Sequence, residues 1–241
     1  MYFFQGEVEE TFSTFDLTHI IVLLISIVLL LLLFIKRDVI ANSSKSQKIG
    51  YFIGGLLLTM DILFYVWKWS TGRQPYFPIP MHLCSWATYI VSMSFFIKNK
   101  YLFHFALYYG TIGGLLSLLV PEFGGYTYNH IRFYQFFLLH FLILAGPAYQ
   151  SFVYKFKIDF KIMAPIVLGG MYLQAFLAWI VNNFYVTLFE EEVANMLYTQ
   201  SPPVALPGIL GNTFVYYLIF GLLFLEIWYG YSKLLNKLNH Q

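Results

Sequence analysis

The sequence predicts an all-α, polytopic membrane helix bundle with about seven transmembrane helices. The composition is the first reason: 59% of the 241 residues are apolar and 11% are charged, whereas a soluble domain carries roughly a quarter charged residues. The second reason is length, because about seven apolar segments reach the roughly 20 residues that a helix needs to cross a bilayer. The third reason is an uneven distribution of lysine and arginine between alternate connections.

We place the predicted spans, in chain order, at roughly residues 18–35, 49–69, 80–97, 101–120, 132–154, 161–182 and 207–231. The first span is not a cleavable signal peptide, because acidic residues from Glu7 to Asp16 precede it where a basic region would be required. The connections leave no room for a further domain. We therefore interpret residues 1–241 as a single integral membrane domain.

Basic residues predict the orientation of these spans. Eleven of the 14 lysine and arginine residues lie in the first, third and fifth connections and in the C-terminal tail. Lys68, Arg73 and Arg132 are the three that lie on the other side. Because cytoplasmic loops carry the excess of positive charge, the N-terminus is expected outside and the C-terminus inside.

Glycine pairs recur in alternate spans, and Gly110 and Gly114 have small-xxx-small spacing. Small residues of this kind let two membrane helices approach closely. We therefore interpret them as packing residues and not as part of a ligand site.

Four polar side chains stand out inside the predicted spans or at their rim: Asp61, His82, Cys84 and His140. An ionisable group in hydrocarbon costs several kcal/mol by most estimates, so its presence indicates a function. At 1.5 Å per residue, Cys84 lies about 6 Å below the outer end of its span, and Asp61 and His140 lie about 12 Å in. All four are thus expected in the outer half of the membrane, with Asp61 and His140 facing the bundle interior.

Each of the four also has a structural explanation. Cys84 could be an inert small hydrophobic residue, and His82 could lie at the level of the lipid headgroups. Asp61 could pair with Lys68 or with Arg73. His140, in contrast, has apolar residues on all sides in the sequence.

A thiol, imidazoles and a carboxylate are together the parts of a nucleophilic acyl-transfer site. The thiolate is the nucleophilic form of cysteine, so Cys84 needs a base within reach. His82 and Cys84 are two residues apart and point away from each other on a regular helix, which makes His140 the expected base and Asp61 the residue that orients it. His82 could serve only if the helix start after Pro80 is irregular.

The sequence resembles the bacterial YwaF-type integral membrane family and, more distantly, the eukaryotic transmembrane acyltransferases that remodel ether phospholipids. The segments that carry the resemblance are Phe12-Ser13 to His19, Pro80-Met81-His82-Leu83-Cys84, Leu107-Tyr108-Tyr109-Gly110, Gly113-Gly114 to Pro121-Glu122, Phe136-Phe137-x-x-His140, Gly146-Pro147, Asn195-Met196-Leu197-Tyr198, Pro202-Pro203 and Leu206-Pro207-Gly208.

This resemblance implies acyl transfer between phospholipids through a cysteine thioester, without coenzyme A. It implies Cys84 as the nucleophile, His140 or His82 as the base, and a bacterial cell membrane as the location. The eukaryotic pattern places the cysteine directly before a histidine, whereas here His82 precedes Cys84 with Leu83 between them. If the histidines are the residues that correspond, the catalytic position falls on Met81, which cannot form a thioester.

The leading hypothesis is therefore an acyltransferase or lipase-like enzyme that acts on a lipid at the outer leaflet. The second is a binding or transport protein for a solute or protons, although such proteins usually place polar groups across the full membrane depth, often in paired repeats. The third is an assembly partner of another membrane protein. No cofactor or nucleic acid is expected. A single cysteine excludes an internal disulfide and a cysteine-based metal site, and the spacing of the histidines and Asp61 matches no known metal motif.

Overall fold

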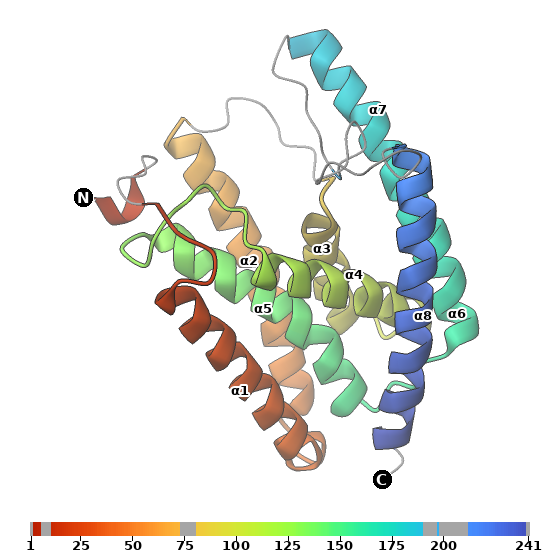
Figure 1. The fold of residues 1–241 in the computed structure, drawn as a ribbon. Coiled ribbons are helices and arrows are strands. Elements are labelled where there is room, and N and C mark those ends of the chain that lie inside the picture. The colour runs from red at the N-terminus through yellow and green to blue at the C-terminus, as the bar shows by residue number, and fades with distance from the viewer. Residues whose placement is uncertain (1, 6–10, 73–80, 190–196, 198–211, 240–241) are drawn as a thin grey trace. The chain divides into compact units, whose positions relative to one another are not determined.

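The computed structural model describes residues 2–5, 11–72, 81–189, 197 and 212–239 (Figure 1). All regular secondary structure in these residues is helical, which confirms the predicted all-α class. The helices, in chain order, are a 3₁₀ turn at Tyr2–Phe4, α1 at Leu17–Ala41, α2 at Ser46–Ser70, α3 at Leu83–Phe96, α4 at Lys100–Leu119, α5 at Ile131–Phe152, α6 at Phe160–Pro165, a π-helical turn at Ile166–Gly170, α7 at Met171–Phe189 and α8 at Thr213–Asn239.

Six described helical stretches are long and apolar enough to cross a membrane, with α6, the π turn and α7 counted as one stretch. α3 is also apolar but has 14 residues, so its regular part rises about 21 Å. The prediction of about seven membrane helices is therefore confirmed. The predicted third span began at residue 80, which lies outside the described residues, and the regular helix begins at Leu83.

Polar side chains set the starts of several helices. Asp16 accepts a hydrogen bond from the His19 backbone N–H at 2.7 Å, and Asn99 accepts from the N–H of Tyr101 at 2.8 Å. His130 accepts from the Arg132 N–H at the start of α5. Such caps satisfy backbone donors that have no partner inside the helix.

The chain forms two compact units. The first comprises Met1–Pro78 and Trp86–Phe156, and the second comprises Ile79–Ser85 and Lys157–Gln241. The boundary passes through the first turn of α3, so Cys84 belongs to the second unit and Tyr89 to the first.

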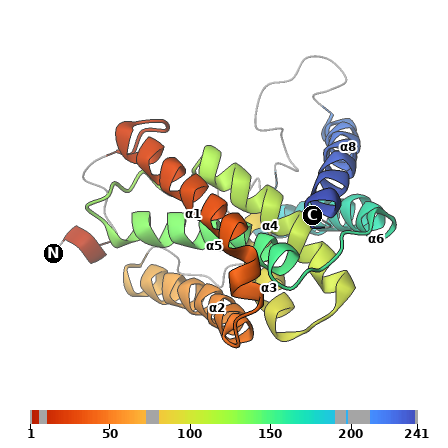
Figure 2. The ribbon, with the colours of Figure 1, turned by 90° about the horizontal axis from the view of Figure 1, so that it is seen from below.

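In the first unit, α5 is the central helix and packs against α1, α2 and α4 (Figure 2). The closest packing uses glycines: a Cβ at Gly110 would lie 2.6 Å from the Ile143 carbonyl oxygen, and one at Gly114 would lie 2.9 Å from the His140 carbonyl oxygen. The predicted packing role is thereby confirmed for these two residues. Gly55 differs, because a Cβ there would meet no atom within 4 Å.

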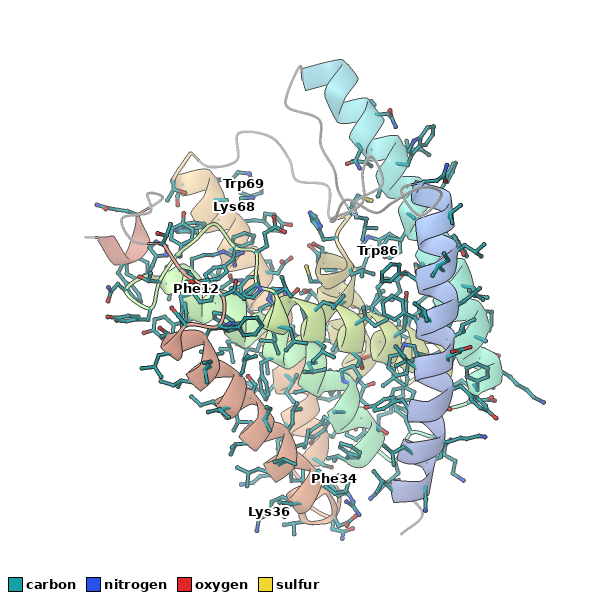
Figure 3. All side chains as sticks on the ribbon, in the orientation of Figure 1. Phe12, Phe34, Lys36, Lys68, Trp69 and Trp86 are labelled. Atoms are coloured by element: carbon teal, nitrogen blue, oxygen red, sulfur yellow. The ribbon has the colours of Figure 1, made fainter. Side chains whose placement is uncertain are left out.

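The N-terminal segment is tied to one end of this unit. The Phe12 N–H donates to the Gly125 carbonyl at 2.8 Å, and the Trp67 indole donates to the Phe4 carbonyl at 3.0 Å. His19 donates from Nε2 to the Leu118 carbonyl, and its Nδ1 accepts the Phe15 N–H. Figure 3 labels Phe12, whose ring meets those of His19 and Phe123 edge to face, and also Lys68 and Trp69 near the end of α2.

His130 bonds in the same way as His19. Its Nε2 lies 2.7 Å from the Gln5 carbonyl oxygen, while its Nδ1 accepts the Arg132 N–H. A carbonyl can only accept, so Nε2 carries the proton in both histidines. The hydrogen bonds that hold the N-terminal segment therefore use both ring nitrogens of each histidine.

The second unit contains α6, α7 and α8. A π-helical turn separates α6 from α7 directly after Pro165. Proline lacks the backbone N–H that an α-helix needs and clashes with the preceding turn, so the hydrogen-bond pattern shifts there. The segment just before α6 is bound to α8 by two hydrogen bonds, in which the Asn236 side chain donates to the Ile158 carbonyl and accepts the Ile158 N–H.

Candidate functional site

Asp61 lies on α2 in the interior of the first unit, where 8% of its surface is exposed. Its carboxylate accepts a hydrogen bond from the Tyr89 hydroxyl of α3 at 2.7 Å. Lys68, one of the partners considered from the sequence, does not pair with Asp61 in the described part of the chain. The other, Arg73, lies outside the described residues. The partner that the structure assigns is therefore a tyrosine.

His140 lies on α5 and is buried, with 4% of its surface exposed. The prediction that Asp61 and His140 face the interior is thus confirmed. Nδ1 of His140 lies 2.7 Å from the Phe136 carbonyl oxygen, one turn earlier in the same helix. Because that oxygen only accepts, Nδ1 carries the proton and the neutral ring has its lone pair on Nε2. A backbone carbonyl, and not Asp61, orients His140.

Nε2 of His140 is buried and has no hydrogen-bond partner among the described residues. The Tyr109 hydroxyl of α4 is in the same state, in a side chain with no exposed surface. A buried polar atom without a partner costs about 1–3 kcal/mol, so each such atom calls for an explanation. Nε2 can accept a proton, and a phenol can donate a hydrogen bond.

Cys84 and His82 lie at the start of α3, within the second unit. Cys84 is in the first helical turn, is half-buried and forms no disulfide. His82 lies just before the helix and is exposed, and its carbonyl accepts the Ser85 N–H at 3.1 Å. His82 therefore lies outside the regular helix. The sequence analysis named an irregular helix start as the condition for His82 to serve as the base for Cys84.

The segment before Cys84 is held by a side chain of α7. Nε2 of Gln174 donates to the Met81 carbonyl at 3.1 Å, and Gln174 has no exposed surface. Its Oε1 is buried without a hydrogen-bond partner among the described residues. Both residues belong to the second unit. Gln174 therefore fixes the backbone at the residue directly before His82, and its amide oxygen remains available.

The four residues selected from the sequence thus divide between the two units, with Asp61 and His140 in the first and His82 and Cys84 in the second. Their joint role stays a prediction. Sequence reasoning missed Tyr89, Tyr109 and Gln174. Gln174 could have been recognised from the sequence, because it is an amide side chain within an apolar span. Tyr89 and Tyr109 could not, because nothing in the sequence distinguishes them from the other tyrosines among the 20 in the chain.

No group of three or more histidine, cysteine or acidic side chains that could hold a metal ion occurs in the described ranges.

One comparison decides the family. The TMEM164 family model matches residues 11–231, which include all four selected residues and Gln174. The chain belongs to the TMEM164 family. The match spans nine-tenths of this TMEM164-family protein, from the segment before α1 into α8. No curated protein matches it, and no solved structure does.

Proposed function

We propose that this TMEM164-family protein is a coenzyme A-independent lipid acyltransferase, with Cys84 as the nucleophile and His140 as the general base. The proposed substrate is a phospholipid in the outer leaflet of a bacterial cell membrane. The likeness to YwaF-type proteins and to the acyltransferases of ether-phospholipid remodelling supports this assignment. The proposal pairs groups of the two units on chemical grounds.

The observation that carries the proposal is the buried Nε2 of His140, which no described residue meets with a hydrogen bond. Its Nδ1–H is bound to the Phe136 carbonyl, so the lone pair on Nε2 has a fixed direction and a fixed tautomer. A base held in this way is ready to take a proton, as the base of a nucleophile–histidine pair must. A histidine with only a packing role would have no reason to leave that atom unbonded in an apolar interior.

The position of Cys84 also suits a nucleophile. It lies in the first turn of α3, where backbone N–H groups lack intrahelical acceptors and the helix dipole favours negative charge. A thiolate forming there is stabilised, and so is the oxyanion of a tetrahedral intermediate. Gln174 is a positioning residue, because it holds the Met81 carbonyl just before this turn.

The reaction has two balanced halves. His140 takes the Cys84 proton, and the sulfur attacks the ester carbonyl of the donor lipid. The C–O bond then breaks, the lysolipid oxygen takes the proton from His140, and the acyl group remains on sulfur as a thioester. In the second half, His140 takes the proton of an acceptor hydroxyl, whose oxygen attacks the thioester. The sulfur leaves and recovers the proton, which restores the thiol.

The test is the lipid profile of cells that express each variant at matched levels. Cys84→Ala and His140→Gln should each remove the acyl transfer that wild-type protein adds, because either loss from a cooperating pair removes nearly the whole effect. Cys84→Ala should remain folded, since a small apolar side chain replaces a small, nearly apolar one.

The chain offers a matched control for His140. His104 of α4 is also buried, and its Nδ1 lies 2.6 Å from the Lys100 carbonyl oxygen, again one turn earlier. If only the hydrogen bond from Nδ1 to a backbone carbonyl were important, His104→Gln and His140→Gln would lower acyl transfer equally. We expect His104→Gln to retain transfer. Full transfer in Cys84→Ala would refute the thioester and favour the binding or transport hypothesis.

A further inference from the structure

A charged cleft of about 320 Å³ opens in the first unit, outside the residues proposed for catalysis. The end of α2, the connection between α4 and α5 and the start of α5 form its walls. Its charged lining residues are Lys68, Glu122 and Arg132. Two cations and one carboxylate around one cleft provide complementary charges for a ligand that carries both signs.

Aromatic rings hold the two cations in place. The Arg132 guanidinium lies 4.0 Å from the centre of the Phe64 ring, and the Lys68 ammonium lies 5.3 Å from the same centre. Trp67 and Tyr126 also line the cleft, and their rings meet edge to face at 5.8 Å. Contacts between cations and aromatic faces restrict the side chains at little cost in desolvation. Both positive groups therefore contact the same ring, that of Phe64, which lines the cleft.

The position of the cleft along the helices places it at the level of the lipid headgroups. Lys68 lies two residues before the end of α2, and Arg132 is the second residue of α5. These helix ends are where the apolar spans meet the polar layer. Tryptophan, tyrosine and long basic side chains are enriched at this level, where lipid headgroups lie. By the predicted orientation this is the outer face.

We propose that this cleft binds the zwitterionic, phosphate-bearing headgroup of a phospholipid. The phosphate lies between Lys68 and Arg132, and the ammonium group faces Glu122 and the rings of Trp67 and Tyr126. The volume supports a headgroup, because ligand sites of drug-sized molecules begin near 300 Å³ and a whole lipid needs more. The acyl chains extend into the bilayer.

The inference does not depend on the proposed reaction, because binding requires no acyl transfer. Its test uses full-length Cys84→Ala protein in detergent, in which the thiol is absent. Native mass spectrometry measures how much protein carries one short-chain phosphatidylethanolamine as its concentration rises. Parallel titrations use short-chain diacylglycerol, phosphatidylglycerol and inorganic phosphate.

We expect phosphatidylethanolamine to bind and diacylglycerol, which lacks the phosphate, to bind at least tenfold more weakly. Lys68→Gln and Arg132→Gln should each weaken phosphatidylethanolamine binding about tenfold, the usual effect of losing one charge-assisted hydrogen bond. Glu122→Gln should weaken phosphatidylethanolamine but not phosphatidylglycerol, which has no ammonium group. Lys98→Gln is the matched control, because Lys98 is an exposed lysine outside the cleft.

Arg132 also contacts the Gln135 side chain and the Phe136 ring, so Arg132→Gln could unfold the protein. In that case the binding measurement on Lys68→Gln tests the proposal by itself. Unchanged binding in Lys68→Gln would overturn the proposal, as would equal binding of diacylglycerol. Displacement of the lipid by an equal concentration of inorganic phosphate would show that the cleft binds a free anion. That result would also overturn the proposal of a lipid headgroup.

Discussion

Tyr89 gives the Asp61 carboxylate its hydrogen bond inside the first unit. We expect Tyr89→Phe to lower the free energy of unfolding by about 1–3 kcal/mol, because the buried Asp61 carboxylate loses the donor that the described residues give it. The measurement is the thermal unfolding midpoint in detergent. Tyr134→Phe is the control, since Tyr134 is 49% exposed on α5.

A second variant separates this bond from the packing of the ring. Asp61→Asn with Tyr89→Phe should recover part of the loss, since the charge that needs the hydroxyl is also gone. If the double variant is as unstable as the sum of the single ones, the two residues are not coupled. The effect would then come from packing.

At the residue scale the sequence identified the groups but not their partners. Asp61 and His140 were recognisable because charge or imidazole is costly in hydrocarbon, whatever its surroundings. Their partners depend on the rotation of neighbouring helices, which no periodicity specifies when a span is apolar on all faces. Phe136 could not be chosen either, because any residue offers a backbone carbonyl. The sequence therefore could not predict that this carbonyl orients His140.

Helix α4 approaches α5 through Gly110, where a Cβ would lie 2.6 Å from the Ile143 carbonyl oxygen. We expect Gly110→Ala to destabilise the protein by about 1–3 kcal/mol, because backbone must move to admit the methyl group. Gly55→Ala should be neutral or stabilising by up to about 1 kcal/mol, since alanine is the better helix former and a Cβ there meets no atom within 4 Å.

The measurement is again the thermal midpoint in detergent, for both variants in parallel. Equal effects at the two glycines would mean that helix propensity, and not interhelical contact, sets the outcome. The comparison therefore tests the α4–α5 contact directly.

At the scale of elements, the sequence predicted the existence of the helices better than their ends. The first span was predicted to stop at residue 35, but α1 continues to Ala41, and α8 continues to Asn239 beyond the predicted residue 231. Hydropathy marks where the apolar window ends, while a helix continues until its backbone is capped or broken. The π turn after Pro165 was missed because proline in a membrane helix often causes only a kink.

The two ends of the first unit should lie on opposite sides of the membrane. A cysteine introduced at Ser44, between α1 and α2, is expected to resist an impermeant thiol reagent in intact cells, and one at Tyr128, between α4 and α5, should react. Both positions are exposed, and Cys84→Ala provides the background. The reason is the concentration of lysine and arginine on the Ser44 side.

The reverse labelling pattern would place the N-terminus inside and the charged cleft at the inner leaflet. Labelling of both positions would indicate leaky cells, which a cytoplasmic marker protein detects. At this scale, charge counts predict orientation because they sum over many residues. Assignment of the site is harder, because it depends on the arrangement of the two units.

The rings of His19 and His130 fasten the N-terminal segment through both of their nitrogens. Each Nδ1 accepts a backbone N–H, from Phe15 and from Arg132. Each Nε2 donates to a distant backbone carbonyl, of Leu118 and of Gln5. A phenyl ring of similar size offers neither the acceptor nor the donor, so His19→Phe should release the segment. Faster amide hydrogen exchange at residues 11–19 in His19→Phe than in wild-type protein would reveal this release; equal protection would exclude it.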